Sequence, residues 1–551
     1  MKKIIFWGAA AFAASGGPGV ALAAVDCANL LDAGRQPYGV TLNSAVETPA
    51  SDDIPVAHCL VRGTTGEHKG VDGKNYAIRF ELRLPDAWNG RFVHQFNGGS
   101  DGVVVPALGP LLGGNKKDTA LSRGYAVVAS DAGHDGQASP EKGIAGGSAF
   151  GFDPQARRDY GYSAVATLNP LAESIVQMHY GRPAEYTYGV GVSNGGRHGL
   201  MAATRMPEIF DGILSGYPGL NLPKAAIQHP HSLKAWASVN SDISKAFSRD
   251  NMKLLADGIL DACDALDGLV DGIVADSPAC QDAFKLEALQ CDNVGDNDCL
   301  SPAQILALRK NSEGPKNSRG EKLYSEWIWD PGMASANWRT WKLESNVDAW
   351  GRKPIIVSLG APSLAQVFTT PPTAVGGSPE ELQAYLLGFD FDRDAPKIFA
   401  TDAVFGESAV QAIIPPDTDN PSLTAFRDAG NKMIVFHGNA DPVFSVLDTI
   451  QWYRKLDDNH GGKAGDFVKL YNLPGMPHGA GGPSYDDFDF FSALVAWVES
   501  GKPPEAIVAG VTAGNKEAAG LKGKRFLYCP FPKIARFSGV AGDDESRFTC
   551  K

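Results

Sequence analysis

Short apolar runs alternate with helical stretches along the first part of the chain. Four runs have the length and composition of buried strands: 77–84, 91–97, 125–130 and 186–192. A helical stretch is predicted at 163–179, and residues 25–75 are expected to be rich in loops. Alternation of strands and helices is typical of a mostly parallel α/β sheet.

The pattern changes near residue 222 to helical pieces, tryptophans, cysteines and Pro/Gly/Ser loops. Apolar strands resume at 432 and 467, and residues 488–500 have the helical spacing of a segment that packs on a sheet. Length alone favours about three or four domains. We instead predict one core in two parts with an inserted lid domain between them: 24–221, 426–551 and 222–425.

Composition agrees with a folded globular protein. With 551 residues, 43% hydrophobic and 21% charged, the chain can bury a large core. The net charge of −13 is spread along the sequence without a basic stripe. Nucleic acid and anionic membranes are therefore not expected as partners.

The first residues have the features of a cleavable signal peptide, predicted as residues 1–23. Lys2 and Lys3 precede an apolar run from 4 to 14, and Ala21-Leu22-Ala23 is a small-residue cleavage pattern. That run is too short to span a bilayer, and no later segment is long enough. We therefore expect a secreted or periplasmic protein; an uncleaved anchor is the alternative.

The sequence Gly191-Val192-Ser193-Asn194-Gly195 follows one of the predicted strands and has the G-x-S-x-G pattern of a nucleophile elbow. Small residues around the serine let it occupy a sharp turn from strand to helix, where its hydroxyl projects outward. A glycine-rich turn could also arise there by chance. Ser193 is our candidate nucleophile.

A serine nucleophile needs a general base and an acid that orients the base, and α/β-hydrolases place them in the chain order Ser, Asp or Glu, His. Asp441 lies on the loop after the strand that starts at 432, and His478 lies on a Gly/Pro loop after the next strand. We predict that both act with Ser193. The alternatives are a turn-forming aspartate and a surface histidine, and for His437 we favour a structural role.

The reaction also needs donors for an oxyanion. The backbone N–H of Asn194 is one candidate, since it follows the nucleophile. Gly98 and Gly99 follow the strand at 91–97, and one of them is predicted as the second donor. A glycine pair after a strand is more often a simple turn, but its place before the nucleophile favours the functional interpretation.

At this point the sequence resembles the tannase/feruloyl esterase family of α/β-hydrolases. The resemblance covers nearly all of the mature chain and rests on these segments: 88–99 (WNGRFVHQFNGG), 129–136 (ASDAGHDG), 159–165 (DYGYSAV), 188–213, 263–273 (CDALDGLVDGI), 437–442 (HGNADP) and 497–505 (WVESGKPPE). It implies an α/β-hydrolase fold with a large inserted lid, a calcium ion in that lid, and aromatic carboxylic esters as substrates. One departure is that the family's usual disulfide between the two catalytic loops cannot form, because Val192 and Gly479 stand at its positions.

The segment 263–273 is a candidate calcium loop. Asp264, Asp267 and Asp271 lie three and four residues apart, and a hard cation would relieve the repulsion between converging carboxylates. Composition alone favours an acidic, glycine-rich surface loop. The resemblance implies carboxylate ligands from these three residues and carbonyl ligands from Leu269 and Ile273.

Eight cysteines in an exported chain predict four disulfides, although 105 pairings are formally possible. Sequence proximity and the resemblance favour these pairs: Cys27 with Cys59, Cys263 with Cys280, Cys291 with Cys299, and Cys529 with Cys550. A zinc site is the alternative, and the absence of a C-x-x-C pair argues against it.

These features predict a secreted serine hydrolase that cleaves esters of aromatic acids through an acyl-enzyme and needs no organic cofactor. The aromatic residues of the lid are candidates to line the substrate pocket, although most are expected in the core: Trp327, Trp329, Trp338, Trp341 and Trp350. Two alternatives remain. One is cleavage of another ester or an amide, such as hydroxyalkanoate oligomers, and the other is an inactive binding protein.

Overall fold

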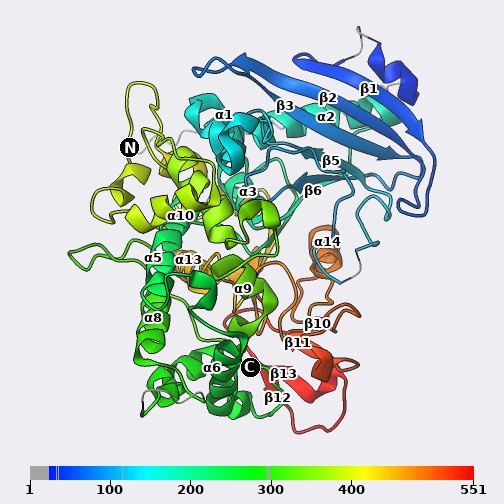
Figure 1. The fold of residues 1–551 in the computed structure, drawn as a ribbon. Helices are drawn as coiled ribbons and strands as arrows, with labels where there is room; N and C mark the ends of the chain where they lie inside the picture. Colours follow the sequence, from blue (N-terminus) through cyan, green and yellow to red (C-terminus); the bar gives the residue numbers. More distant parts are fainter. Residues whose placement is uncertain (1–23, 33, 35, 115, 294–297) are drawn as a thin grey trace, which may run out of the picture.

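A nine-stranded sheet runs through the part of the chain that the computed structural model describes, residues 24–32, 34, 36–114, 116–293 and 298–551 (Figure 1). Its order is β1-β2-β3-β5-β4-β6-β7-β8-β9. The strands are β1 Val40–Thr48, β2 His58–Lys69, β3 Asn75–Pro85, β4 Arg91–Phe96, β5 Ala126–Ser130, β6 Tyr186–Val192, β7 Gly212–Gly216, β8 Lys432–Gly438 and β9 Val468–Leu473. Neighbours from β5 to β9 pair in parallel, which confirms the predicted α/β class.

Residues 25–75, expected to be rich in loops, also contain two strands that the sequence analysis did not predict. β1 and β2 lie there, and they extend the sheet as antiparallel neighbours of β3. In β1 the buried Val40 and Leu42 alternate with the exposed Thr41 and Asn43. Such alternation of apolar and polar residues is normal where one face of an antiparallel strand meets water. Because the polar residues interrupt the apolar run, the sequence analysis did not predict a strand here.

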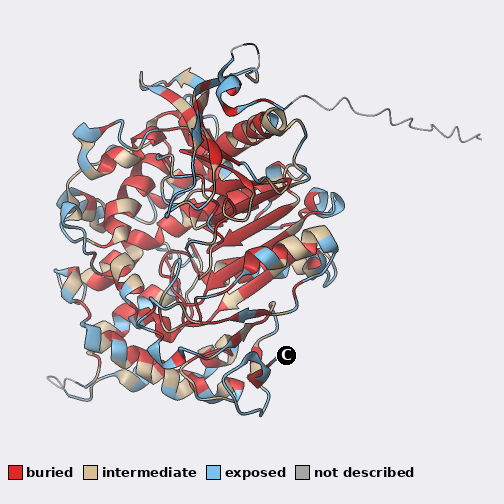
Figure 2. Ribbon diagram, turned by 90° about the vertical axis from the view of Figure 1, so that its right-hand side faces the viewer, coloured by how far each residue is buried: buried red, intermediate tan, exposed pale blue. Residues whose placement is uncertain are grey.

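Helices cover both faces of the sheet. The α-helices are α1 Pro154–Arg158, α2 Ala164–Tyr180, α3 Asn194–Arg205, α4 Leu222–Ala226, α5 Gln228–Ala237, α6 Arg249–Cys263, α7 Ser277–Ala283, α8 Pro302–Glu313, α9 Ala336–Lys342, α10 Pro379–Gly388, α11 Ala409–Ile413, α12 Thr424–Asp428, α13 Val446–Asn459 and α14 Phe490–Ser500. In β8, Met433 and Val435 pack in the core formed with α3 and α13, whereas Ile434 and Phe436 pack with α14. Figure 2 shows the strands as a buried layer between these helices.

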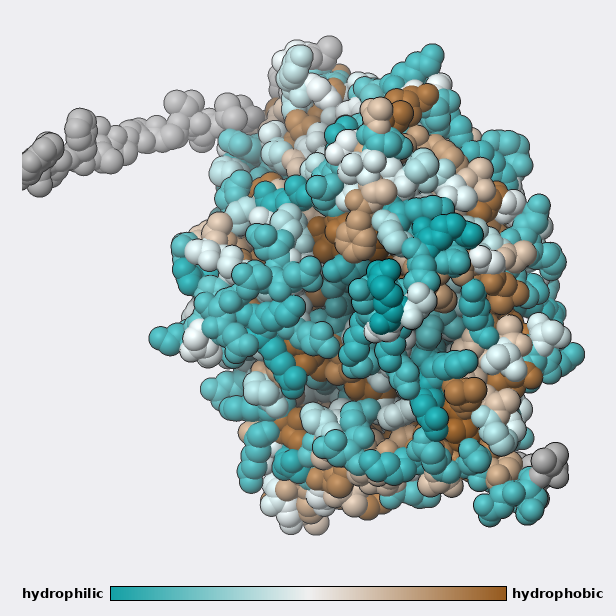
Figure 3. All heavy atoms as spheres, turned by 90° about the vertical axis from the view of Figure 1, so that its left-hand side faces the viewer, coloured by the Kyte–Doolittle hydropathy of each residue, from teal (hydrophilic) through white to brown (hydrophobic). Residues whose placement is uncertain are grey.

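Residues 217–431 connect β7 to β8 and, among the described residues, contribute no strand to the sheet. They supply most of a separate hydrophobic cluster, which includes the fully buried Trp236 and Leu364. On the face that carries α8 and α10, hydrophilic side chains dominate and the apolar ones form small separate patches (Figure 3). The apolar side chains of this segment therefore lie mainly inside it.

The C-terminal part adds two small antiparallel pairs of strands beside the main sheet. They are β10 Ile507–Ala509 with β11 Phe526–Tyr528, and β12 Ala535–Phe537 with β13 Phe548–Cys550. All four predicted disulfides are present in the structure: Cys27–Cys59, Cys263–Cys280, Cys291–Cys299 and Cys529–Cys550. Each bridge closes a local loop and restricts the unfolded chain.

The predicted signal peptide, residues 1–23, lies outside the described residues. Within the described part, no helix combines the length and the apolar character needed to cross a bilayer.

Candidate active site

Ser193 lies at the break between β6 and α3, as the elbow motif predicted. It adopts φ 63° and ψ −125°, a strained conformation for a residue with a side chain. The flanking glycines explain why the turn is possible. A Cβ on Gly195 would lie 2.5 Å from the carbonyl oxygen of Phe96, and one on Gly191 would lie 2.7 Å from the carbonyl of Gly195.

The three predicted catalytic side chains meet in one line of hydrogen bonds. The Ser193 hydroxyl lies 2.9 Å from Nε2 of His478. On the other side of the ring, Nδ1 of His478 lies 2.7 Å from Oδ2 of Asp441. The Asp441 side chain is fully buried and that of His478 is 9% exposed. This geometry allows His478 to take a proton from Ser193 while a carboxylate fixes its tautomer.

The surroundings of Asp441 stabilise its ionised form. Oδ1 accepts hydrogen bonds from the backbone N–H groups of Val443 and Phe444, at 2.8 and 3.0 Å. Burial alone would raise the pKa of Asp441, but the neighbouring His478 and His437 bring that pKa below its usual range. His437, for which we favoured a structural role, lies 3.3 Å from Oδ2 of Asp441 and also contacts a backbone carbonyl.

The predicted oxyanion donors lie beside the nucleophile. Asn194 is the first residue of α3, where backbone N–H groups have no partner within the helix. Gly98 faces the elbow, since a Cβ on it would lie 3.7 Å from Cβ of Ser193. Gly99 follows with a positive φ of 64°, and the backbone N–H of Asp101 closes the turn onto the carbonyl of Gly98.

A buried polar network joins these two loops, and the sequence analysis missed it. The side-chain amide of Asn194 donates to Oδ2 of Asp101 at 2.8 Å, and its oxygen accepts from Nε of Arg197 at 2.6 Å. His198 lies 3.1 Å from the same carboxylate oxygen. Asp101 stands two residues after Gly99 in the printed sequence, but no local pattern showed that it would reach α3.

Aromatic rings surround the ring of His478. Trp341, Phe444 and Tyr217 have ring centroids 5.3, 5.4 and 5.8 Å from it. Of the other predicted tryptophans, Trp327 donates from its indole N–H to the backbone carbonyl of Asp441. Trp338, in contrast, is buried in the hydrophobic cluster of the connecting segment, as we expected for most of them.

The loop that carries His478 is held by α9. The side-chain amide of Asn337 donates to the backbone carbonyl of His478 at 2.8 Å. The loop-to-loop disulfide implied by the family resemblance cannot form here, because neither Val192 nor Gly479 is a cysteine; Val192 is half-buried against the core and Gly479 is exposed with φ 97°. Contacts from α9 therefore hold the loop where a covalent bond is missing.

The candidate calcium loop folds around its own backbone. The carboxylate of Asp264 accepts from the N–H groups of Asp271 and Gly272, and that of Asp267 accepts from Leu269. Burial, together with neighbouring carboxylates, raises the pKa of Asp267 to about 7 and that of Asp271 to about 6.

Oxygen Oδ2 of Asp271 is buried without a hydrogen-bond partner, 3.8 Å from a guanidinium nitrogen of Arg547. Such an orphaned oxygen and the crowding of acidic groups fit a cation. However, the described residues contain no group of three or more His, Cys, Asp or Glu side chains converging as a metal site. Backbone carbonyls, as predicted for Leu269 and Ile273, would have to complete the ligand set.

Comparison with known proteins identifies the family. The model of the tannase and feruloyl esterase family matches residues 61–551. The chain belongs to the tannase and feruloyl esterase family. It is therefore a carboxylic ester hydrolase, and the alternative of an inactive binding protein is set aside.

Several members of the tannase and feruloyl esterase family are similar to the chain over most of its length. A mono(2-hydroxyethyl) terephthalate hydrolase of Piscinibacter sakaiensis is 39% identical over 534 residues, covering 92% of this chain and 87% of that protein. A probable feruloyl esterase of Arthroderma benhamiae is 26% identical, covering 91% and 87%. The crystal structure of feruloyl esterase B from Aspergillus oryzae shares the fold, with a TM-score of 0.73 at 21% identity, covering 95% of this chain and 99% of that one.

Proposed function

We propose that this esterase cleaves esters of aromatic carboxylic acids through an acyl-enzyme on Ser193. The observation that carries the proposal is the unbroken line of hydrogen bonds from Asp441 through His478 to Ser193. A nucleophile, a base and an orienting acid within contact distance are what this reaction requires.

In the proposed mechanism, His478 removes the proton from Ser193 as its Oγ attacks the ester carbonyl. The negative charge that develops on the carbonyl oxygen is held by backbone N–H groups at Asn194 and at the Gly98-Gly99 turn. His478 then gives its proton to the leaving alcohol. Water attacks the acyl-enzyme by the same route and releases the acid.

The aromatic substrate class is supported by two observations. Trp341, which is partly exposed, lies 5.3 Å from the ring of His478, where an aromatic acyl group could stack on it. Feruloyl and terephthalate esters also appear in the names of the relatives with which this chain aligns. Residues 222–425 would act as the lid over this site, since they contribute Trp341 and the contacts of α9 to the His478 loop.

Within that lid we propose a structural calcium site at residues 264–273. Asp264, Asp267 and Asp271 would supply carboxylate oxygens, and Leu269 and Ile273 backbone carbonyls. The ion would neutralise buried acidic groups and cross-link the loop. The proposal is supported by the unpaired buried oxygen of Asp271.

We also propose that the protein is exported. Support comes from the signal-like sequence of residues 1–23 and from the four disulfides, which persist in oxidising compartments.

The decisive experiment compares the wild-type enzyme with Ser193→Ala. Turnover of an aryl ester should fall by a factor on the order of 10³ to 10⁶, and a fluorophosphonate should label only the wild type. Full activity in the variant would end the proposal. A panel of aromatic esters, hydroxyalkanoate oligomers and amides then tests the substrate class, and preference for an aliphatic ester or an amide would contradict it.

A further inference from the structure

Glu517 bridges α9 and the loop that carries His478. Its Oε1 accepts a hydrogen bond from the backbone N–H of Ala336 at 2.7 Å, and its Oε2 accepts one from the backbone N–H of Gly482 at 3.0 Å. Ala336 is the first residue of α9, so this N–H has no partner within the helix. The glutamate thus ties the helix that contacts His478 to the part of the loop that follows His478.

The loop is packed more closely before His478 than after it. Residues 473–477 are buried, and the carboxylate of the buried Asp330 accepts a hydrogen bond from the N–H of Gly475 at 3.1 Å. Gly479, directly after the base, is exposed, and a Cβ on it would have no neighbouring atom within 4 Å. Packing therefore restrains the second half of the loop much less than the first half.

The stretch after His478 is also rich in glycine. Gly479, Gly481 and Gly482 all have positive φ, at 97°, 85° and 69°. Glycine loses more conformational freedom on ordering than any other residue. An open cavity of about 1150 Å³ lies beside Gly479 and Gly481, and Glu517 is one of its lining residues. The stretch therefore has both the freedom and the room to move unless its far end is held.

That far end, Gly482, is held through both of its backbone polar groups. Its N–H donates to Glu517, and its carbonyl accepts a hydrogen bond from the side-chain amide of Asn515 at 3.1 Å. Oδ1 of Asn515 accepts in turn from the backbone N–H of Glu517, also at 3.1 Å. Because Asn515 is buried, it fixes the turn from which Glu517 reaches the loop and α9.

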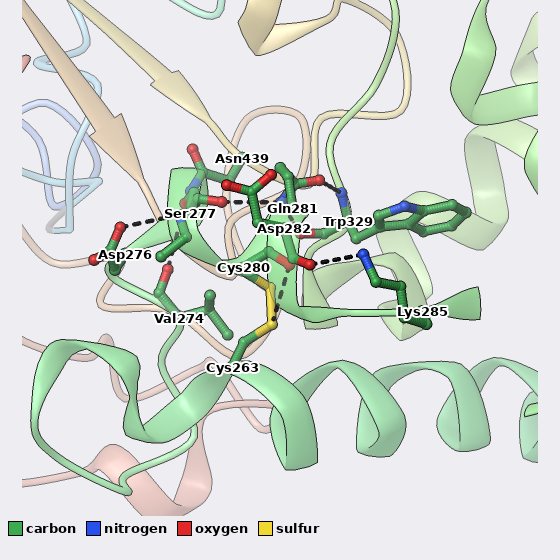
Figure 4. Close-up of a disulfide and its surroundings, with 11 residues drawn as sticks. Cys263, Val274, Asp276, Ser277, Cys280, Gln281, Asp282, Lys285, Trp329 and Asn439 are labelled. Carbon is green, nitrogen blue, oxygen red and sulfur yellow. Dashed lines mark hydrogen bonds between the residues drawn. A yellow bond between two sulfur atoms is a disulfide. The ribbon is translucent and has the colours of Figure 1, made fainter. Parts of the chain in front are cut away.

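The loop of Asp441 is braced in another way. Asn439, on that loop, donates from Nδ2 to Oγ of Ser277 on α7 at 2.6 Å (Figure 4). The Cys263–Cys280 disulfide ties α7 to the end of α6. For the candidate base, the corresponding brace is the carboxylate that lies between α9 and the loop.

We propose that Glu517 is a positioning residue that holds His478 on Ser193 by fixing the glycine-rich loop against α9. The inference rests on the proposed ester hydrolysis, because it concerns the base of that reaction. Both carboxylate oxygens bind backbone N–H groups, so the effect of Glu517 on the reaction passes through the loop. The side chain is exposed, so its loss should disturb the base more than the stability of the whole fold.

The test compares Glu517→Ala and Glu517→Gln with the wild-type enzyme in the hydrolysis of an aryl ester. Glu517→Ala removes both hydrogen bonds, and kcat should fall on the order of 3- to 10-fold with KM nearly unchanged, because a displaced base slows proton transfer. Glu517→Gln keeps one acceptor oxygen and should recover part of this loss. An unchanged kcat in Glu517→Ala, or a raised KM with kcat intact, would overturn the proposal.

Glu381→Ala is the matched control. Glu381 is also exposed and also accepts a hydrogen bond from a backbone N–H at the start of a helix, α10 in the same connecting segment. Its replacement should leave kcat at the wild-type value. An equal loss of kcat in Glu381→Ala and Glu517→Ala would mean a general loosening of this segment and would overturn the specific role of Glu517.

Combination with Asn337→Ala tests the path of the effect. Asn337 and Glu517 restrain the same loop, so the double variant should lose less kcat than the product of the two single losses. A loss equal to that product would overturn the shared path. Ser193→Ala separates this proposal from the proposed function: if it abolishes turnover while Glu517→Ala keeps full activity, only the role of Glu517 is refuted.

Discussion

Asn337 holds the backbone of His478 through a 2.8 Å hydrogen bond from its side-chain amide to the histidine carbonyl. Trp341, one turn further along α9, packs its ring against the imidazole at 5.3 Å. Residues four apart share one face of a helix, so a single short helix restrains both the main chain and the side chain of the candidate base.

Removing this restraint should impair catalysis more than folding. In Asn337→Ala, kcat for an aryl ester should fall about tenfold with KM nearly unchanged, because a poorly placed base slows proton transfer. Steady-state kinetics and thermal unfolding would show this. Thr340→Ala, on the same helix, is the control, and an equal loss in both variants would contradict the specific role of Asn337.

The Asp101–Asn194 hydrogen bond should set the geometry of the oxyanion donors. Asn194→Ala keeps the backbone N–H but frees the loop, and we expect kcat to fall roughly tenfold to a hundredfold, less than the loss of a whole donor. Asp101→Ala should have a similar effect. Because both changes break the same Asp101–Asn194 hydrogen bond, the losses should be far from additive, and the double variant should be little worse than either single variant.

The control for the comparison of the Asp101 and Asn194 variants is Asp153→Asn. This change alters a buried carboxylate that caps α1. Its effect on kcat should be small and should add to that of Asn194→Ala. If the losses of kcat in Asp101→Ala and Asn194→Ala add up fully in the double variant, the network does not position the oxyanion donors. The same holds if these variants lose only melting temperature and keep kcat.

Acid should destabilise the protein through its buried histidines. Burial lowers the pKa of His94 and of His134 from the ordinary histidine value of 6.5 to about 4. Between these values the unfolded chain binds protons that the folded chain does not, so stability falls as the pH drops from about 6.5 to 4. His94→Gln should flatten the dependence of melting temperature on pH. An unchanged slope in His94→Gln would exclude this residue as a cause.

Removal of calcium should lower stability and leave chemistry intact. A chelator should reduce the melting temperature by several degrees, since an ion that binds only the folded state stabilises it by mass action. Turnover well below the melting temperature should be unchanged. Asp271→Asn should abolish the response to added calcium, while Asp257→Asn on the exposed face of α6 should retain it. A wild-type protein indifferent to chelator would remove the site from the proposal.

Which contacts of the candidate site could be predicted from the sequence depends on whether they leave a local pattern. Ser193, Asp441 and His478 were predictable because each lies on a recognisable strand-loop pattern, and the family order relates them. The contact between Asn337 and His478 spans 141 positions and leaves no local mark. The same holds for Asp101 with Asn194, which are 93 positions apart.

The weakly patterned β1 and β2 were missed for a different reason. Their outer face meets water, and the polar residues there break up the apolar run that a buried strand shows.

If Ser193 and His478 act as proposed, the long segment that connects β7 to β8 also determines when activity can first arise. β7 ends at Gly216 and its neighbour β8 begins at Lys432, while Ser193 and His478 are 285 positions apart. The chain is synthesised from its N-terminus, so Ser193 leaves the ribosome long before His478 has been added to the chain. On the proposed mechanism, the hydroxyl of Ser193 therefore has no base until the C-terminal part of the chain has been made.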